Sequence, residues 1–281
     1  MRFTLPTSAD TSAFSSPPTP YAELNGVLRI LVDEVWGALG DSFVGAYLQG
    51  SFAVGDFDQH SDVDFIVAVR DELTDRQVAA LQVLHPRIYG LECVWAQHLE
   101  GSYFPTAVLR DYRHAGAPVW YLDHGSRSLI RSNHCNTSLV RWVVREWGVP
   151  LAGPPASTLV DTIPVAELRR EIIEVMHRFG KELLEDPSPY RNRFYLAFIV
   201  HTYCRMLHDL IEGRPGSKRA ATTWAKAYLD PQWSGLIDRS WAGRPNPVVS
   251  VRQPPDAADF ESALAFVRYV IAESARRGFS P

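Results

Sequence analysis

The chain has 281 residues, of which 46% are hydrophobic and 21% are charged, with a formal net charge of −4 at pH 7. These values are typical of a soluble globular protein with apolar material for one large or two smaller cores. The small negative charge provides no global basic field, so extended nucleic acid is not favoured as a partner, although a local basic patch stays compatible with this charge. No apolar run reaches the roughly 18 residues of a membrane span, and we expect no membrane partner.

The cysteines indicate a reducing compartment. Cys93, Cys135 and Cys204 are far apart and match no zinc or redox spacing. We interpret them as buried free thiols, because an odd count without a disulfide pattern suits a reducing environment. The N-terminus also lacks the pattern of a signal peptide, so we expect a cytoplasmic protein.

The first part of the chain predicts a tail followed by an α/β domain. Residues 1–20 are rich in Ser, Thr and Pro, which predicts a disordered tail. Helical and strand-like patterns alternate from residue 21 to residue 153. The expected elements are helices over 21–39 and 75–84, strands at 44–48, 62–69 and 91–95, and a loop over 52–61.

The second part changes to a helical pattern. Pro150, Gly153, Pro154 and Pro155 mark a linker, and an all-α helical bundle is expected over 154–281. One of its helices is apolar on nearly every face, which predicts the buried centre of the bundle. The fold class is therefore a two-domain α+β/α protein, a mixed sheet with helices followed by the bundle. The expected helices of the bundle are 165–184, the apolar 193–212, and 256–277.

Gly50-Ser51 followed by Asp62-Val63-Asp64 is the most informative stretch of the sequence. Two aspartates at i and i+2 on a strand point to the same face, so Asp62 and Asp64 can share Mg²⁺ with the phosphates of a nucleotide. Gly50 lets the backbone approach a phosphate closely, and Ser51 offers a hydroxyl and a backbone N–H. The pattern predicts a phosphoryl-transfer site that depends on magnesium.

A third carboxylate would complete this site, and Glu92 is the candidate. It lies between Leu91 and Cys93 in the expected strand at 91–95, where a charge needs a partner or a metal. Glu92 would act as general base on the acceptor hydroxyl or as another metal ligand. The alternative is an exposed residue of an edge strand. Asp56 and Asp58 are assigned to a solvated loop.

The chain resembles a known superfamily at these residues. Leu48-Gln49-Gly50-Ser51 followed by His60-Ser61-Asp62-Val63-Asp64-Phe65 resembles the signature of the DNA polymerase β-like nucleotidyltransferases. Leu151-Ala152-Gly153-Pro154-Pro155 resembles the linker of the streptomycin/spectinomycin adenylyltransferases. Their helical C-terminal domain is similar to Tyr203-Cys204-Arg205, Gly213, Ser217-Lys218 and Trp224-Ala225. The resemblance implies that Ser51 contacts phosphate, that Asp62 and Asp64 bind Mg²⁺, and that Glu92 is the base.

The same resemblance implies that the C-terminal domain supplies ATP ligands at Arg205, Lys218 and Trp241. An unpaired guanidinium in the apolar helix at 193–212 would be costly, and a phosphate partner would explain Arg205. Lys218 lies in the first turn of an expected helix, where the helix dipole disfavours a cation. The alternatives are a solvated surface lysine for Lys218 and simple packing for Trp241.

One departure from the family bears on the acceptor. Streptomycin-acting members carry an acidic residue near the start of the central helix, and this chain has Tyr195 there. Trp120 matches the family's N-terminal tryptophan only loosely. The resemblance therefore favours spectinomycin over streptomycin, with Glu92 and Asp123 as acidic residues that could attract a cationic drug.

The predicted protein is a monomeric adenylyltransferase, with ATP and a small hydroxylated acceptor as partners and Mg²⁺ as cofactor. The acceptor would be an aminoglycoside or aminocyclitol, as in antibiotic resistance. One alternative is a protein or RNA acceptor, as in toxin–antitoxin or regulatory nucleotidyltransferases. Another alternative is an inactive binding module, against which the retained carboxylates Asp62, Asp64 and Glu92 argue.

Overall fold

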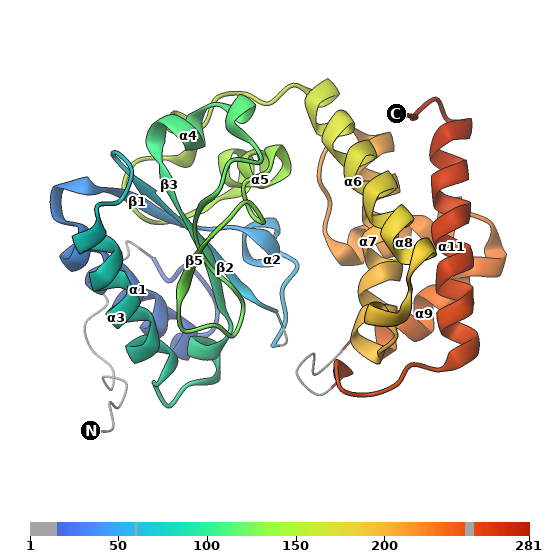
Figure 1. The fold of residues 1–281 in the computed structure, drawn as a ribbon, viewed down its shortest axis with the longest axis horizontal. Coiled ribbons are helices and arrows are strands. Elements are labelled where there is room, and N and C mark those ends of the chain that lie inside the picture. The colour runs from blue at the N-terminus through green and yellow to red at the C-terminus, as the bar shows by residue number, and fades with distance from the viewer. Residues whose placement is uncertain (1–15, 60, 245–249) are drawn as a thin grey trace. The chain divides into compact units, whose positions relative to one another are not determined.

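The structure, a computed structural model, describes residues 16–59, 61–244 and 250–281 (Figure 1). The chain divides into two compact units, one ending at Ile163 and the other beginning at Pro164, later than the expected boundary at 153/154. Most of the expected tail, residues 1–15, lies outside the described residues. Thr19 is buried, and its backbone N–H and carbonyl both bond to the side chain of Asn25. No helix in the described part of the chain has the length and apolar character needed to cross a membrane.

The first unit is built on a mixed sheet of six strands in the order β5-β4-β3-β2-β1-β6. The pairing of β2 with β3 is parallel, and the other pairings are antiparallel. This sheet confirms the predicted fold class for the first part of the chain. The strands are β1 (Phe43–Leu48), β2 (Val63–Val69), β3 (Leu99–Pro105), β4 (Val119–Leu122), β5 (Leu129–Ser132) and β6 (Val149–Ala152).

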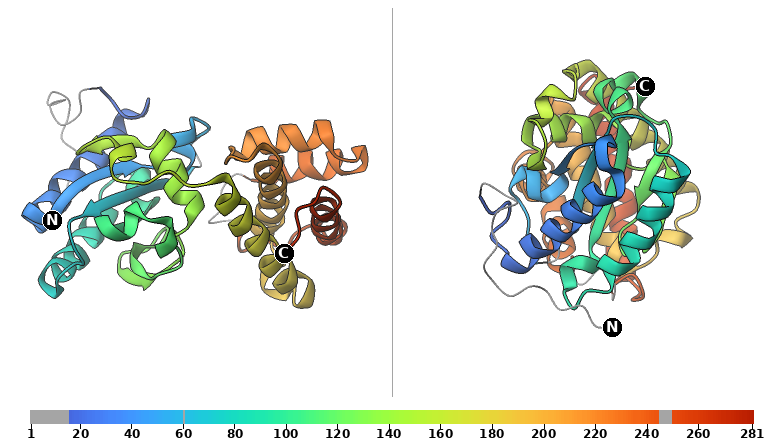
Figure 2. Two further views of the ribbon diagram at one scale, coloured as in Figure 1. Left: turned by 90° about the horizontal axis from the view of Figure 1, so that it is seen from above. Right: turned by 90° about the vertical axis from the view of Figure 1, so that its left-hand side faces the viewer.

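Helices α1 and α3 lie side by side and pack on one face of this sheet (Figures 1 and 2). Their buried leucines and valines share a core with Val63, Phe65 and Val67, which alternate along β2. Thr74 begins α3 with a capping box that it forms with Gln77. The helices of this unit are α1 (Ala22–Leu39), α2 (Gly50–Val54), α3 (Asp75–Tyr89), α4 (Thr106–Arg110) and α5 (Ser138–Trp147), with short 3₁₀ turns at Gly40–Ser42, Val94–Gln97, Tyr112–His114 and Ala156–Thr158.

The expected third strand at 91–95 is wrong. Residues 91–93 form bends and Val94–Gln97 is a 3₁₀ turn, while the third strand is β3, further along the chain. Leu91, Cys93 and Trp95 are buried and Glu92 is exposed. Buried and exposed side chains therefore alternate along this segment as they do in a strand, although the segment is not part of the sheet. Periodicity of two therefore misidentified the element.

Two connections also differ from expectation. The start of the expected loop at 52–61 belongs to the short helix α2. The expected linker begins within strand β6, where Pro150 pairs with Tyr47 of β1. An edge strand tolerates proline because one side of its backbone has no strand partner. The Tyr47 hydroxyl donates to the Pro154 carbonyl at 2.6 Å, so the segment after β6 is hydrogen-bonded to a side chain of the sheet.

The second unit is a helical bundle, as predicted. Helix α7 packs against α6, α8, α9 and α11, which confirms the apolar segment at 193–212 as its centre. Gly213 ends α7 with φ +68°, a left-handed conformation that suits glycine. The helices are α6 (Val165–Glu185), α7 (Arg193–Glu212), α8 (Lys218–Tyr228), α9 (Ser234–Gly243) and α11 (Ala257–Arg276), with 3₁₀ turns at Ser188–Tyr190 and Pro231–Trp233.

Candidate active site

The sheet brings three carboxylates to one region of the first unit. Asp62 immediately precedes β2, and Asp64 is the second residue of that strand. In the parallel pairing of β2 with β3, the partner of Asp64 is Glu100. Directly paired residues project to the same face of a sheet, and the i, i+2 spacing adds Asp62 to that face.

Glu100, rather than Glu92, is the strand carboxylate beside the aspartates. Glu92 is exposed in the bend before the Val94–Gln97 turn, outside the sheet. The strand argument that supported Glu92 is therefore wrong. Sequence reasoning missed Glu100 because β3 begins Leu-Glu-Gly-Ser, which has little strand character. Its signal was the run Tyr103-Phe104 that follows, which is typical of a buried strand.

Gly101 explains why this strand looks weak in sequence. A Cβ at this position would lie 2.5 Å from the ring of Phe65, which fills the space above the strand. Glycine therefore permits β3 to pair closely with β2 at the point where Asp64 meets Glu100.

The turn after β1 contacts Asp64. Gly50 has φ +58°, and a Cβ there would overlap Asp64 Oδ2. The backbone N–H of Gln49 donates to the Asp64 carbonyl at 2.9 Å. The Ser51 hydroxyl oxygen is buried and has no hydrogen-bond partner among the described residues. This turn thus offers an unsatisfied hydroxyl next to a carboxylate, which is the chemistry of a phosphate and cation site.

A tyrosine joins Glu100 to a fourth carboxylate. The Tyr121 hydroxyl lies 2.7 Å from Glu100 Oε1 and 3.0 Å from Asp123 Oδ1. Burial and the hydrogen bond to Glu100 raise the pKa of Tyr121 well above its usual range, so the hydroxyl remains a donor. Asp123, which the sequence suggested as an acidic residue that could attract a cationic drug, therefore lies close to the sheet carboxylates.

The thiol of Cys135 lies in the negative electrostatic field of these carboxylates. It is buried, and its Sγ lies 3.6 Å from Glu100 Oε1. Burial raises the pKa of the Cys135 thiol far above its usual range, and the charges of Glu100 and Asp64 raise it further. The thiol is therefore neutral at physiological pH and is no nucleophile. The same field attracts cations to this face of the sheet.

The second unit groups Lys218 and Trp241 around a buried histidine. His201 of α7 contacts the Trp241 ring at 5.3 Å between centroids. Burial, together with the charges of Lys218 and Arg244, lowers the pKa of His201 to about 3. The guanidinium groups of Arg219 and Arg244 lie 5.2 and 4.6 Å from the centroid of the Trp241 ring. The neighbourhood of Trp241 is therefore strongly positive.

Arg205 lies one turn further along α7 and is half-buried. The nearby Asp209 is buried and accepts hydrogen bonds from His208 Nδ1 and the Gly216 N–H, both at 2.8 Å. Burial raises the pKa of Asp209, while the His208 bond and the charge of Arg205 oppose that rise. Arg205 therefore has a carboxylate nearby, and this negative charge is a second explanation for the guanidinium besides the expected phosphate.

These features define a class. A strand followed by Gly50-Ser51, and then Asp62 and Asp64 at the next strand of a mixed sheet, is the arrangement of a nucleotidyltransferase fold. The resemblance noted from the sequence is confirmed by comparison with known proteins. Residues 158–273 match the family described as aminoglycoside adenylyltransferase, C-terminal domain.

A solved structure agrees along nearly the whole chain. The spectinomycin adenyltransferase AAD(9) from Enterococcus faecialis, crystallised with ATP and spectinomycin, superposes with a TM-score of 0.64. The match covers 88% of this chain and 98% of that one at 15% sequence identity. At this identity the likeness shows a shared fold. The chain therefore shares this two-part fold, and its residues 158–273 are similar to the helical C-terminal domain of the aminoglycoside adenylyltransferases.

Proposed function

We propose that the protein transfers AMP from ATP to a hydroxyl group of a small cationic acceptor, in a reaction that depends on Mg²⁺. The observation that carries this proposal is the register of β2 and β3, which sets Glu100 beside Asp64 and on the face that Asp62 shares. Two metal-binding carboxylates and one base are the groups that such a transfer needs from the protein.

The residues at this face fit a magnesium ion with a triphosphate. Asp62 and Asp64 offer the hard oxygen ligands that Mg²⁺ prefers. Ser51 has a buried hydroxyl available to a phosphate oxygen, and Gly50 leaves no side chain between the backbone and the Asp64 carboxylate. When bound, Mg²⁺ would neutralise charge on the phosphates and on the departing pyrophosphate.

Glu100 is the general base in this proposal, in place of Glu92. The acceptor hydroxyl oxygen forms a bond to the α-phosphorus of ATP, and the bond from that phosphorus to pyrophosphate breaks. Glu100 accepts the proton that the hydroxyl releases. The Tyr121 hydroxyl holds Glu100 Oε1 at 2.7 Å and so orients the carboxylate for this step.

The positive groups of the second unit suit the anionic nucleotide. We assign Arg205 and Lys218 to the triphosphate and Trp241 to the nucleotide, as the family resemblance implies. The support from this chain is the concentration of cations near Trp241, including Lys218, Arg219 and Arg244. Guanidinium and ammonium groups bind phosphate oxygens through charge-assisted hydrogen bonds.

The acceptor is proposed to be spectinomycin or a similar aminocyclitol. Asp123 and Glu100 supply negative charge for a cationic acceptor, and they share the Tyr121 hydroxyl. Tyr195 stands where streptomycin-acting relatives have an acid, and its ring packs edge-on against Tyr190 and Phe198. The phenol of Tyr195 does not itself offer a carboxylate to a guanidino drug, which argues against streptomycin.

The test is AMP transfer by the purified full chain with Mg²⁺ and ATP labelled in the α-phosphate. Spectinomycin, streptomycin and a cell lysate are offered as separate acceptors. Label on spectinomycin and not on streptomycin supports the proposal in full. Label found only on protein or RNA of the lysate would replace the small acceptor by a macromolecule. Transfer that persists unchanged in Asp64→Asn would contradict the proposed metal site.

A further inference from the structure

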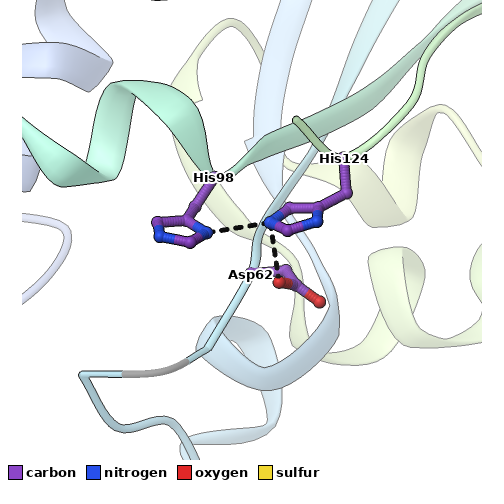
Figure 3. A group of neighbouring side chains, drawn as sticks. All are labelled: Asp62, His98 and His124. Carbon is purple, nitrogen blue, oxygen red and sulfur yellow. Dashed lines mark hydrogen bonds and ion pairs between the residues drawn. The ribbon is translucent and has the colours of Figure 1, made fainter. Parts of the chain in front are cut away.

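Two histidines, His98 and His124, form a cluster with Asp62. His98 directly precedes β3, and His124 follows β4 in a turn (Figure 3). His98 Nδ1 lies 2.8 Å from His124 Nε2, and His124 Nε2 lies 3.2 Å from Asp62 Oδ1. Three ligating atoms from three segments of the sheet therefore converge, all within 4.8 Å of one another.

Hydrogen bonding alone fits this cluster poorly. His124 Nε2 can carry at most one hydrogen, yet it faces both the His98 nitrogen and the Asp62 oxygen. If His124 donates to Asp62, it cannot accept from His98 at the same atom. If it accepts from His98, no hydrogen of the His124 ring lies between His124 Nε2 and the Asp62 oxygen. A cation at the centre would satisfy all three atoms together.

The spacings match those of ligands around one metal ion. Nitrogen and oxygen ligands about 2.1 Å from an ion lie about 3.0 Å apart on adjacent octahedral positions and about 3.4 Å apart in a tetrahedron. The observed 2.8 and 3.2 Å are close to this range. Two imidazoles with one carboxylate are a known ligand set for zinc and for iron, with positions left for water or substrate.

We propose that Asp62, His98 and His124 form a site for a divalent transition-metal ion of the Zn²⁺ class, separate from the magnesium ligands except for the shared Asp62. Imidazole nitrogen favours such ions, whereas Mg²⁺ prefers oxygen ligands and water. The side chains of Asp62 and His124 are 40% and 26% exposed, so an ion can enter from solvent. This site rests on its own geometry and does not require the proposed transfer reaction.

The shared aspartate couples the two sites. A Zn²⁺ ion held by the histidines draws on the same carboxylate that the proposed function assigns to Mg²⁺. Zn²⁺ therefore lowers the rate of AMP transfer at a fixed Mg²⁺ concentration, and His98→Ala weakens that inhibition. This coupling, unlike the metal site itself, depends on the proposed function.

The metal site is tested by binding to the full chain without nucleotide. Calorimetry with Zn²⁺ is expected to show one equivalent bound, and Co²⁺ is expected to give visible absorption bands in the unsubstituted protein. His98→Ala and His124→Ala are expected to raise the dissociation constant for Zn²⁺ at least ~10-fold, the scale of effect known for weakened metal sites. The exposed His114→Ala is the matched control and retains the affinity.

A second cluster of possible metal ligands is the alternative binding site that this experiment must distinguish. Glu100, His134 and Cys135 also bring three ligating atoms within 4.8 Å of one another. If His134→Ala abolishes Zn²⁺ binding and the other two histidine variants retain it, the proposed site is wrong. Failure of the unsubstituted protein to bind either Zn²⁺ or Co²⁺ also overturns it, whatever the folding of the variants.

Discussion

Asp64 and Glu100 are direct partners in the parallel pairing of β2 with β3. The acid that the sequence suggested, Glu92, lies in an exposed bend before β3. This pairing makes Glu100 the third carboxylate of the site, and it leaves Glu92 outside the sheet.

Exchange of Glu100 for glutamine tests this assignment. Glu100→Gln keeps the shape of the side chain and an acceptor for Tyr121, but it removes the base. We expect the rate of AMP transfer to fall about 100- to 10,000-fold, the usual contribution of a general base, with ATP binding retained. Glu92→Gln is the matched control, and its rate should stay near that of the parent. The reverse pattern in kcat would restore Glu92 as the base.

Gly50 is expected to be intolerant of any side chain. In Gly50→Ala the new Cβ meets Asp64 Oδ2, so the carboxylate must move, and displacement by about 1 Å typically costs about 100-fold in rate. Gly55→Ala is the control, because Gly55 also has positive φ but no atom lies within 4 Å of its Cβ position. Both variants should lose about 1 kcal/mol or more of stability from backbone strain. Chemical denaturation and transfer rates measure the two effects, and equal losses of rate would argue against a role of the Gly50 approach.

Lys218 and Lys226 form a matched pair on helix α8. Lys218→Met removes an ammonium proposed to bind the triphosphate, and we expect the KM for ATP to rise about 10-fold or more, in line with a lost charged hydrogen bond. Lys226 instead contacts Asp238 at 2.6 Å on an exposed surface, so Lys226→Met should leave KM unchanged. Steady-state kinetics with varied ATP distinguishes them. An unchanged KM in both variants would return Lys218 to the role of a surface lysine.

His85 is expected to make the fold sensitive to acid. Burial lowers the pKa of His85 to about 4, from an ordinary value of 6.5. Between these values the unfolded chain binds a proton that the folded chain does not, so stability is lost as the pH falls from 6.5 toward 4. The slope from this residue reaches about 1.4 kcal/mol per pH unit.

His85→Gln removes this titration and keeps a polar partner for Tyr103, which lies 2.8 Å from His85 Nε2. We expect a shallower fall of the free energy of unfolding over that pH range, measured by denaturant titration at several pH values. His114→Gln, at an exposed position, should retain the parent slope. A slope that His85→Gln leaves unaltered would show that other groups dominate the acid response.

Much of the fold could be predicted because its helices carry strong local patterns. The segment 193–212 is apolar on nearly every face, and α7 has the predicted bounds and lies at the bundle centre. The strand that begins at Val63 was also clear, since β-branched and aromatic residues make up most of it. Such elements are visible in sequence because burial alone determines their composition.

The third carboxylate could not be found in the same way. Glu100 depends on strand register, which is a long-range property, and Gly101 weakens the local strand pattern for the sake of packing against Phe65. The convergence of His98 with His124 likewise arises from the pairing of β3 with β4 and has no counterpart in local spacing. The sequence therefore revealed the two aspartates and Gly50-Ser51, whereas Glu100 and the neighbouring histidines followed only from the structure.

The pairing of β2 with β3 also ties the proposed transfer reaction to correct folding of the sheet. A shift of one residue would turn Glu100 toward the core that contains Phe65 and Val67, and would leave Leu99 or Gly101 beside Asp64. Burying that carboxylate without a partner costs several kcal/mol, so the misaligned sheet is disfavoured. The charge that the proposed reaction requires thus also discriminates against the nearest misfolded sheet, and regain of the proposed transfer activity during refolding would mark the moment when the strands align.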